Sequence, residues 1–245
     1  MKRMMFLPVL CALLLTSCRG ELKLADGRKI EPSSRIVKNE YRQPAFDKVD
    51  ISLVANVKLI QSSGNDHRVV LSCPDNYVEL FKFEVEGGEL EAQFVRDAVN
   101  IEPHKVDVTI YCPQLHSLDN SAVASVEISR LKTDRLKVEN SGVGTLYLSG
   151  LSVGKLDVDC SGVGGIELGG EAEKAQLDCS GVGSIKAENL KAKTVKAEVS
   201  GVGGIRCYAS ESLEAEVSGV GSLKYGGSPQ HKRLQRNGVG DISEL

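Results

Sequence analysis

The chain has 245 residues, with 30 basic and 33 acidic side chains and a formal net charge of −3. This balance, without any basic run interleaved with aromatic residues, argues against a nucleic-acid partner. Aromatic residues make up only 4 % of the chain and Trp is absent, whereas there are 25 glycines. Such a composition favours short strands and many turns over a deep aromatic pocket, and we expect no cofactor.

The N-terminus has the features of an export signal. It reads MKRMMFLPVLCALLLTSC, with Lys2 and Arg3 before an apolar run that is too short to span a bilayer. The final LTSC resembles a bacterial lipobox, which predicts a signal peptide over residues 1–17 and lipidation of Cys18. A plain signal peptide that contains a cysteine is the alternative. We expect a lipid anchor in the outer membrane, with the domain facing the cell surface or the periplasm.

The next two segments differ in pattern. Residues 18–40 begin with the lipidated cysteine and are polar without periodicity, so we expect a flexible tether there. Residues 41–118 alternate between apolar and polar side chains, as in Val49-Asp50-Ile51, which predicts a series of strands. This N-terminal β region is expected to start or to cap the structure that follows it.

A tetrapeptide repeat organises the remainder of the chain. SGVG begins at Ser141, Ser161, Ser180, Ser200 and Ser218, preceded by SAVA at Ser121 and followed by NGVG at Asn237. The steps between copies are 20, 20, 19, 20, 18 and 19 residues, a period typical of a solenoid. Short segments with period-2 alternation lie on both sides of each copy, and no helical pattern follows any of them. These features predict an all-β fold, a single-stranded parallel β-helix over residues 119–245 with about 20 residues per coil.

The repeated SGVG is predicted to be the corner between two sheets. The first glycine of each copy is expected to adopt positive φ, and the valine after it to point inward and stack on its neighbours. A phosphate-binding loop would need a helix after the glycines, which the sequence lacks. The predicted structural corner glycines are Gly142, Gly162, Gly181, Gly201, Gly219 and Gly238.

The position just before each corner is expected to form a column inside the β-helix. It holds Asn120 and Asn140, then Cys160 and Cys179. We expect the two asparagines to form an internal amide ladder and the two cysteines to be stacked free thiols, because parallel Cβ vectors do not suit a disulfide. Scattered histidines and an odd cysteine count predict neither a metal site nor a disulfide framework.

Three stretches carry a resemblance to a known family: FDKVDISLVANVKLIQ, VDVTIYCPQLHSLDNSAVASVEI and the SGVG ladder. Over roughly Ile36 to Leu245 the chain resembles the family called putative auto-transporter adhesin, head GIN domain, found in Bacteroides-like bacteria. The resemblance implies a right-handed β-helix, similar in shape to pectin-lyase folds but without their catalytic residues, and an adhesion role. SAVA departs from the glycine corner, so the first coil is expected to turn differently.

Outward positions before the corners are rich in acid, and we name Asp157, Asp159, Asp178 and Glu198 as a candidate ligand or cation stripe. A solvated, charged sheet face is the simpler interpretation.

Two functional hypotheses follow. The first is a non-catalytic cell-envelope lipoprotein that binds glycans or proteins through the faces of its β-helix, with a homo-oligomer as a further option. The second is a carbohydrate-active enzyme, a polysaccharide hydrolase or lyase, that uses the acidic stripe as a carboxylate pair.

Overall fold

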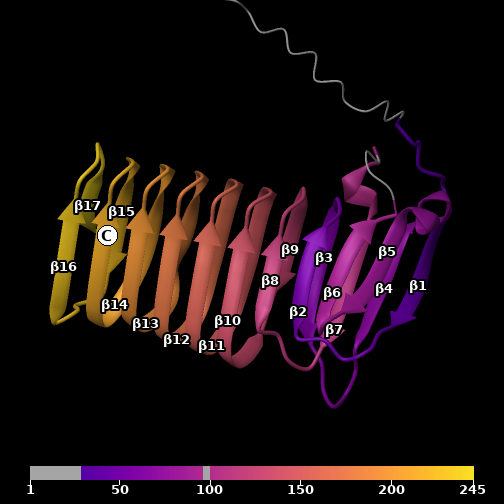
Figure 1. The fold of residues 1–245 in the computed structure, drawn as a ribbon, viewed down its shortest axis with the longest axis horizontal. Coiled ribbons are helices and arrows are strands. Elements are labelled where there is room, and N and C mark those ends of the chain that lie inside the picture. Colours follow the sequence, from indigo (N-terminus) through magenta and orange to yellow (C-terminus); the bar gives the residue numbers. More distant parts are fainter. Residues whose placement is uncertain (1–28, 96–99) are drawn as a thin grey trace, which may run out of the picture.

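The computed structural model describes residues 29–95 and 100–245. The predicted signal peptide and the lipidation site Cys18 lie outside these residues. Figure 1 shows a column of stacked strands that runs from β1 at one end to β16 and β17 at the other. Within the described residues, no helix is long and apolar enough to span a membrane.

The described residues up to Ile128 form nine strands and two short 3₁₀ helices. Their bounds are β1 Ile36–Arg42, β2 Lys48–Ser52, β3 Ala55–Gln61, β4 Arg68–Pro74, η1 Asp75–Leu80, β5 Phe81–Glu86, β6 Glu89–Phe94, η2 Pro103–Lys105, β7 Asp107–Cys112, β8 Ser117–Asn120 and β9 Ala124–Ile128. The residues from Leu131 onward form eight strands, of which the first five are longer, at 10–18 residues, and end just before a corner. They are β10 Leu131–Asn140, β11 Val143–Cys160, β12 Val163–Cys179, β13 Val182–Val199, β14 Val202–Val217, β15 Val220–Gly226, β16 His231–Arg236 and β17 Asp241–Glu244.

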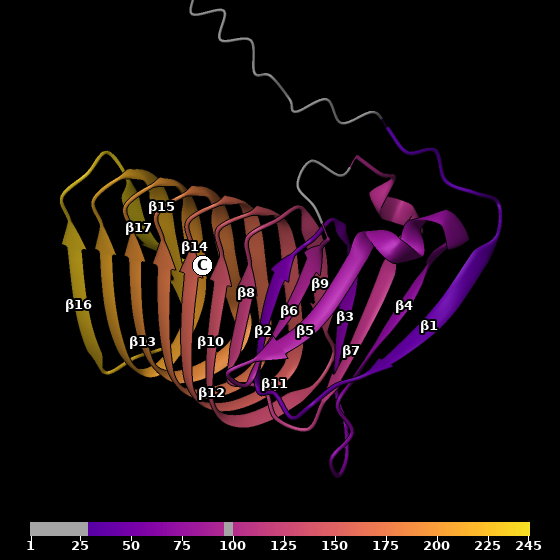
Figure 2. The same cartoon turned by 45° about the vertical axis from the view of Figure 1, so that its right-hand side comes forward.

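The strands from β8 onward form a parallel β-helix, as the repeat predicts. Leu136 pairs with Leu156, and Leu156 with Ala175, so each coil repeats the register of the one before. The first sheet consists of the segments before the corners and the second sheet of the segments after them. A third side is formed by the parallel segments 131–133, 151–153, 170–172 and 190–192. Figure 2 shows the coils wrapping around a common interior.

The N-terminal coils do not follow chain order. Strand β2 pairs with both β6 and β8, and β3 pairs with both β7 and β9. The β2–β3 coil therefore lies between the β6–β7 coil and the β8–β9 coil, as Figure 1 shows. Strands β1, β4 and β5 run antiparallel to their neighbours and end the stack. The parallel edge at this end is thus covered by strands from the same chain.

The corner glycines are needed for a reason other than the predicted one. None of the six has positive φ; instead the backbones of successive coils approach closely there. A Cβ added to Gly162 would lie 2.1 Å from the Gly142 carbonyl oxygen, and the Gly162 N–H donates to the Asn140 carbonyl at 2.9 Å. Any side chain at these positions would separate the coils, so the corner needs glycine for space.

The prediction that the corner valines point inward is wrong. Val143, Val163, Val182, Val202 and Val220 are 49–58 % exposed. The sharp turn at each glycine carries the following residue to the outside, so the valines form an apolar row along the corner. The interior is filled instead by the alternating residues of the strands, such as Leu146, Ile166 and Ile185.

The inner column before the corners lies where the repeat places it. Cys160 pairs with Cys179 in register, and both are buried free thiols. The Asn120 amide donates to Asn140 Oδ1 at 2.8 Å, and the Asn140 amide donates to the Gly144 carbonyl at 3.4 Å. The amide ladder is confirmed in part, because the buried Asn120 Oδ1 has no hydrogen-bond partner.

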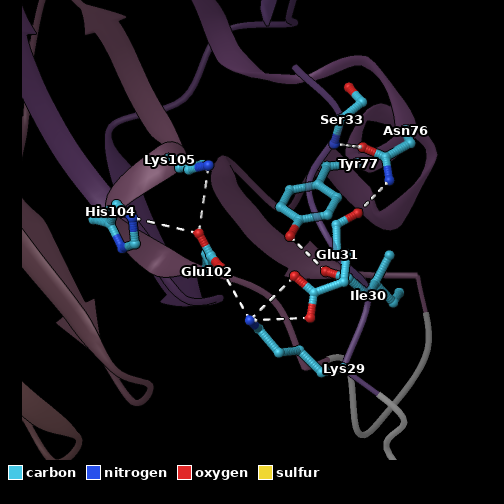
Figure 3. A network of polar contacts seen from close by, with 9 residues as sticks. All are labelled: Lys29, Ile30, Glu31, Ser33, Asn76, Tyr77, Glu102, His104 and Lys105. Carbon is cyan, nitrogen blue, oxygen red and sulfur yellow. Dashed lines mark hydrogen bonds and ion pairs between the residues drawn. The ribbon is translucent and has the colours of Figure 1, made fainter. Parts of the chain in front are cut away.

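The predicted tether extends too far along the chain. Strand β1 begins at Ile36, and the residues from Lys29 onward already contact the domain (Figure 3). Tyr77, which is fully buried, donates its hydroxyl to the Ile30 carbonyl at 2.6 Å. Lys29 Nζ lies 3.0 Å from Glu102. This lysine, as hydrogen-bond donor, is the main cause of the lowered pKa of Glu102. We call residues 29–35 the N-terminal latch.

The last coil replaces apolar interior residues with charged ones. Lys232 stands in register with Leu213, Arg236 with Val217, and Glu244 with Tyr225. The Tyr225 hydroxyl donates to Glu244 at 3.0 Å, and Lys232 lies 3.3 Å from the same carboxylate. A polar outer coil is what a solenoid needs at its end, because it keeps the core from facing solvent.

Candidate binding surfaces

One continuous row of acidic side chains runs along the first sheet. Strand register stacks Asp119, Glu139, Asp159, Asp178, Glu198 and Glu216 on consecutive coils. Pairing of β2, β6 and β5 extends the row to Asp50, Glu91 and Glu84. Nearly all of these side chains are half-buried. Paired strands are about 4.8 Å apart, so this acidic row is a ladder of like charges.

The structure brings together three of the four predicted stripe residues. Asp159, Asp178 and Glu198 are adjacent in the acidic row, whereas Asp157 lies in the neighbouring row. There Asp157 forms an ion pair with Lys155 at 2.7 Å. The strict alternation of each strand identified the members from Glu139 onward. Asp50 and Glu91 were missed, because only the non-sequential order of the N-terminal coils aligns them.

The acidic row has two carboxyl groups with perturbed titration. Burial is the main cause of the raised pKa of Asp178, and the neighbouring Glu198 and Asp159 add to it. Burial likewise raises the pKa of Asp119, with further contributions from Asp50 and Glu139. Among the described residues, no group of three or more His, Cys, Asp or Glu side chains is arranged to hold a metal ion. The row therefore offers hydrogen-bond acceptors without a preformed cation site.

Four of the six predicted corner glycines, Gly142, Gly162, Gly181 and Gly201, line a groove of about 560 Å³. One wall is the serine row, including Ser141, Ser161 and Ser180, and the other is the row of exposed valines. The groove follows the corner over several coils because the glycine between each serine and valine has no side chain. It is an amphipathic surface, with hydroxyl groups on one side and methyl groups on the other.

A second groove, of about 720 Å³, lies on the third side of the column. Its walls carry both lysines and carboxylates, and Gln61, Gln114 and His116 line it as well. The Gln61 amide donates to the Lys132 carbonyl at 3.0 Å and its oxygen accepts from the Lys132 N–H at 3.0 Å. Nothing in the sequence repeat indicates this third-side groove, because it depends on residues that vary from coil to coil.

The five cysteines among the described residues are all buried free thiols. Burial raises the pKa of Cys112 and of Cys207 to about 12, so both are protonated at neutral pH. Cys160 is also buried, and both its hydrogen bond to Cys179 and its burial raise its pKa. These side chains fill the interior of the column.

The fold and its surfaces define the class of protein: a parallel β-solenoid that presents long rows of repeated side chains to solvent. The family model described as putative auto-transporter adhesin, head GIN domain, matches residues 45–229. The chain belongs to this family. A comparison with curated proteins gives no match.

Solved structures agree with this assignment. A putative adhesin from Bacteroides fragilis NCTC 9343 is 37 % identical, with a TM-score of 0.84 over 88 % of this chain and 100 % of that one. A putative lipid binding protein from Parabacteroides distasonis ATCC 8503 is 20 % identical, with a TM-score of 0.73 over 89 % and 100 % of the two chains. A putative adhesin from the same organism is 18 % identical, with a TM-score of 0.70 over the same shares. The last two show a shared fold.

Proposed function

We propose that the protein is a non-catalytic cell-envelope lipoprotein that binds a glycan or a protein through the outer surface of its β-helix. Membership of a family described as adhesins supports this role, as does the 37 % identical relative that carries the same description. The N-terminal sequence supports export, a lipid anchor at Cys18 and a place in the outer membrane. A single acyl chain binds a membrane only weakly, so stable anchoring needs more than one.

The observation that carries the proposal is the geometry of the acidic row. Its carboxylates project from one side of one sheet at regular intervals. None of its members lines the corner groove or the third-side groove. An inverting glycosidase needs its acid and base on opposite sides of the sugar ring, and a retaining enzyme needs an acid and a nucleophile that flank the same bond. A row of parallel side chains along a sheet favours a binding surface over that arrangement.

One experiment separates binding from catalysis. The full-length protein, purified in detergent, is applied to arrays of glycans and extracellular proteins, and every bound glycan is recovered and analysed by mass spectrometry. The proposal predicts retention of an intact ligand. Shortened oligosaccharides would instead support the carbohydrate-active enzyme, and loss of that activity in Asp159→Asn or Asp178→Asn would assign it to the acidic row. Absence of binding to either array would contradict the proposal.

A further inference from the structure

The third-side groove has a gap in its wall at one coil. The outward row of this side runs Lys132, Ser152, Glu171 and Lys191 in register. Three of these side chains are long and charged, and Ser152 between them is short. The adjacent position on the same coil is Gly154, which has no side chain at all. The gap spans one coil, with charged side chains on both sides.

Gly154 itself has a structural reason to be glycine. A Cβ at this position would lie 2.5 Å from the Asp134 carbonyl oxygen. Ser152 has no such constraint, because it is exposed and its row accepts lysine and glutamate on the neighbouring coils. The short side chain at Ser152 therefore keeps the groove open without any demand from the packing of the coils.

Several charged groups beside the gap have no partner. Within residues 29–95 and 100–245, no hydrogen bond or ion pair is formed by the side chains of Lys132, Asp134 and Glu171. Elsewhere in the same groove Lys193 forms an ion pair with Glu173 at 2.7 Å, so charged side chains on this surface can pair when they lie on adjacent coils. The gap thus combines unpaired donors and acceptors of both signs in one concave place.

We infer that the third-side groove is a binding site for a neutral oligosaccharide, centred on Ser152 and Gly154. This inference rests on the proposed binding function and names the site and the ligand class. Sugar hydroxyl groups can donate to Asp134 and Glu171 and accept from Lys132, whereas an anionic polymer would meet the carboxylates. The volume of about 720 Å³ falls within the range of small-ligand sites, about 300–1,000 Å³.

A protein partner fits this groove less well than a sugar. Protein interfaces depend on aromatic or aliphatic side chains that fill apolar pockets at their centre. The lining of the third-side groove contains no Phe, Tyr or Trp, and its apolar members, such as Val153 and Ala172, are buried beneath polar neighbours. Hydrogen bonding to a hydroxyl-rich ligand is the interaction that this lining supports.

The test compares full-length variants on an array of neutral oligosaccharides, followed by calorimetry with the strongest binder. Ser152→Arg fills the gap, and Glu171→Gln removes one unpaired carboxylate with little change in shape. Ser125→Arg is the matched control, because Ser125 is exposed on β9, lines neither groove and lies outside the acidic row, and the change introduces the same side chain. Thermal unfolding of each variant checks that it folds.

We expect Ser152→Arg to weaken binding at least tenfold, Glu171→Gln to weaken it severalfold, and Ser125→Arg to leave it within twofold. Wild-type affinity in both groove variants would overturn the site while leaving the proposed function intact. Binding of the wild type to proteins but to no glycan would overturn the ligand class. Failure of the wild type to bind any glycan or any extracellular protein would contradict the proposed function itself.

Discussion

The two halves of the molecule build one continuous column by different means. From β8 onward the coils follow one another in chain order and repeat the same register. Before β8 the chain inserts the β2–β3 coil between others and ends the stack with antiparallel strands. The buried aromatic rings of Phe46, Phe81 and Phe83 all belong to this first half. Repetition extends a solenoid, whereas its end needs a specific, non-repeating structure.

The glycines show the same contrast. In the first half, Gly64, Gly87 and Gly88 have positive φ and no neighbouring atom closer than 4.0 Å to an added Cβ. Their role is the backbone conformation of turns, which for Gly87 and Gly88 is the β5–β6 hairpin. In the second half, the corner glycines are surrounded by the backbone of the preceding coil. These three glycines are needed for their dihedral angles, whereas the six corner glycines are needed for their small size.

Substitution of a corner glycine is expected to have the largest effect on stability. Gly162→Ala places a methyl group against the Gly142 carbonyl oxygen, which is backbone and cannot move without opening the stack. We expect the free energy of unfolding to fall by about 3 kcal/mol or more. Urea denaturation measures it, with Gly88→Ala as the control. That change strains only a turn, at φ +82, and should cost about 1–2 kcal/mol. Equal losses would contradict the distinction between the two kinds of glycine.

Two valines of β13 test which side chains form the core. Val195 is 1 % exposed and Val182 is 57 % exposed. Val195→Ala is expected to lower the free energy of unfolding by about 2 kcal/mol through a cavity, and Val182→Ala by less than about 0.5 kcal/mol. Both are measured by thermal and urea unfolding. A large loss of stability in Val182→Ala would indicate that the corner valines are packed in the interior.

The N-terminal latch is expected to contribute less to the free energy of unfolding than the core valine. Tyr77→Phe keeps the buried ring but removes the hydroxyl that donates to the Ile30 carbonyl. We expect a loss of about 1 kcal/mol in the free energy of unfolding, together with faster hydrogen exchange at the Ile30 amide. Tyr147→Phe, on a ring that is 45 % exposed, is the control and should change neither. Unchanged exchange at Ile30 in the Tyr77 variant would show that the latch does not depend on this bond.

Acid is expected to act in opposite directions through Asp178, in the second half, and through Glu102, in the first half. The raised pKa of Asp178 means that its charge destabilises the folded state at neutral pH. This destabilisation is relieved as the pH falls towards the ordinary pKa of an aspartate, 3.8. The lowered pKa of Glu102 means that its charge stabilises the folded state above its ordinary pKa of 4.5. This stabilisation is lost as the pH falls below that value.

Asp178→Asn should therefore stabilise the protein at pH 7 by up to about 0.5 kcal/mol, and this gain should disappear in acid. Asp157→Asn removes an ion-paired carboxylate instead and should give no gain. Urea unfolding of both variants at pH 7 and near pH 3.5 measures the difference. A loss of stability in Asp178→Asn at pH 7 would show that the acidic row is not a ladder of repulsive charges.

The second half of the fold is predictable from the sequence because one short-range rule determines it. The period of about 20 residues and the strict alternation place Leu156, Cys160 and Asp159 on their correct sides without any knowledge of the rest. Alternation fails at the corner itself. There the turn at Gly162 leaves Val163 outside, and a period-2 pattern contains no information about that turn.

The first half and the third-side groove are not predictable in the same way. The insertion of the β2–β3 coil depends on pairing between residues distant in the chain, as between Asp50 and Asp119. The groove depends on a break in the pattern at Ser152 and Gly154, which a repeat-based alignment treats as variation. The proposed sugar site depends on departures from the repeat, and these become visible only when the coils are stacked.

Display on the cell surface is the property that an adhesin most needs, and antibody labelling of intact cells tests it directly. Antibodies against the folded domain are applied to intact and to permeabilised cells, with a periplasmic protein as the control. The proposed function predicts equal labelling of both, while the periplasmic control is labelled only after permeabilisation. Labelling of the domain only after permeabilisation would contradict an adhesin that faces outward.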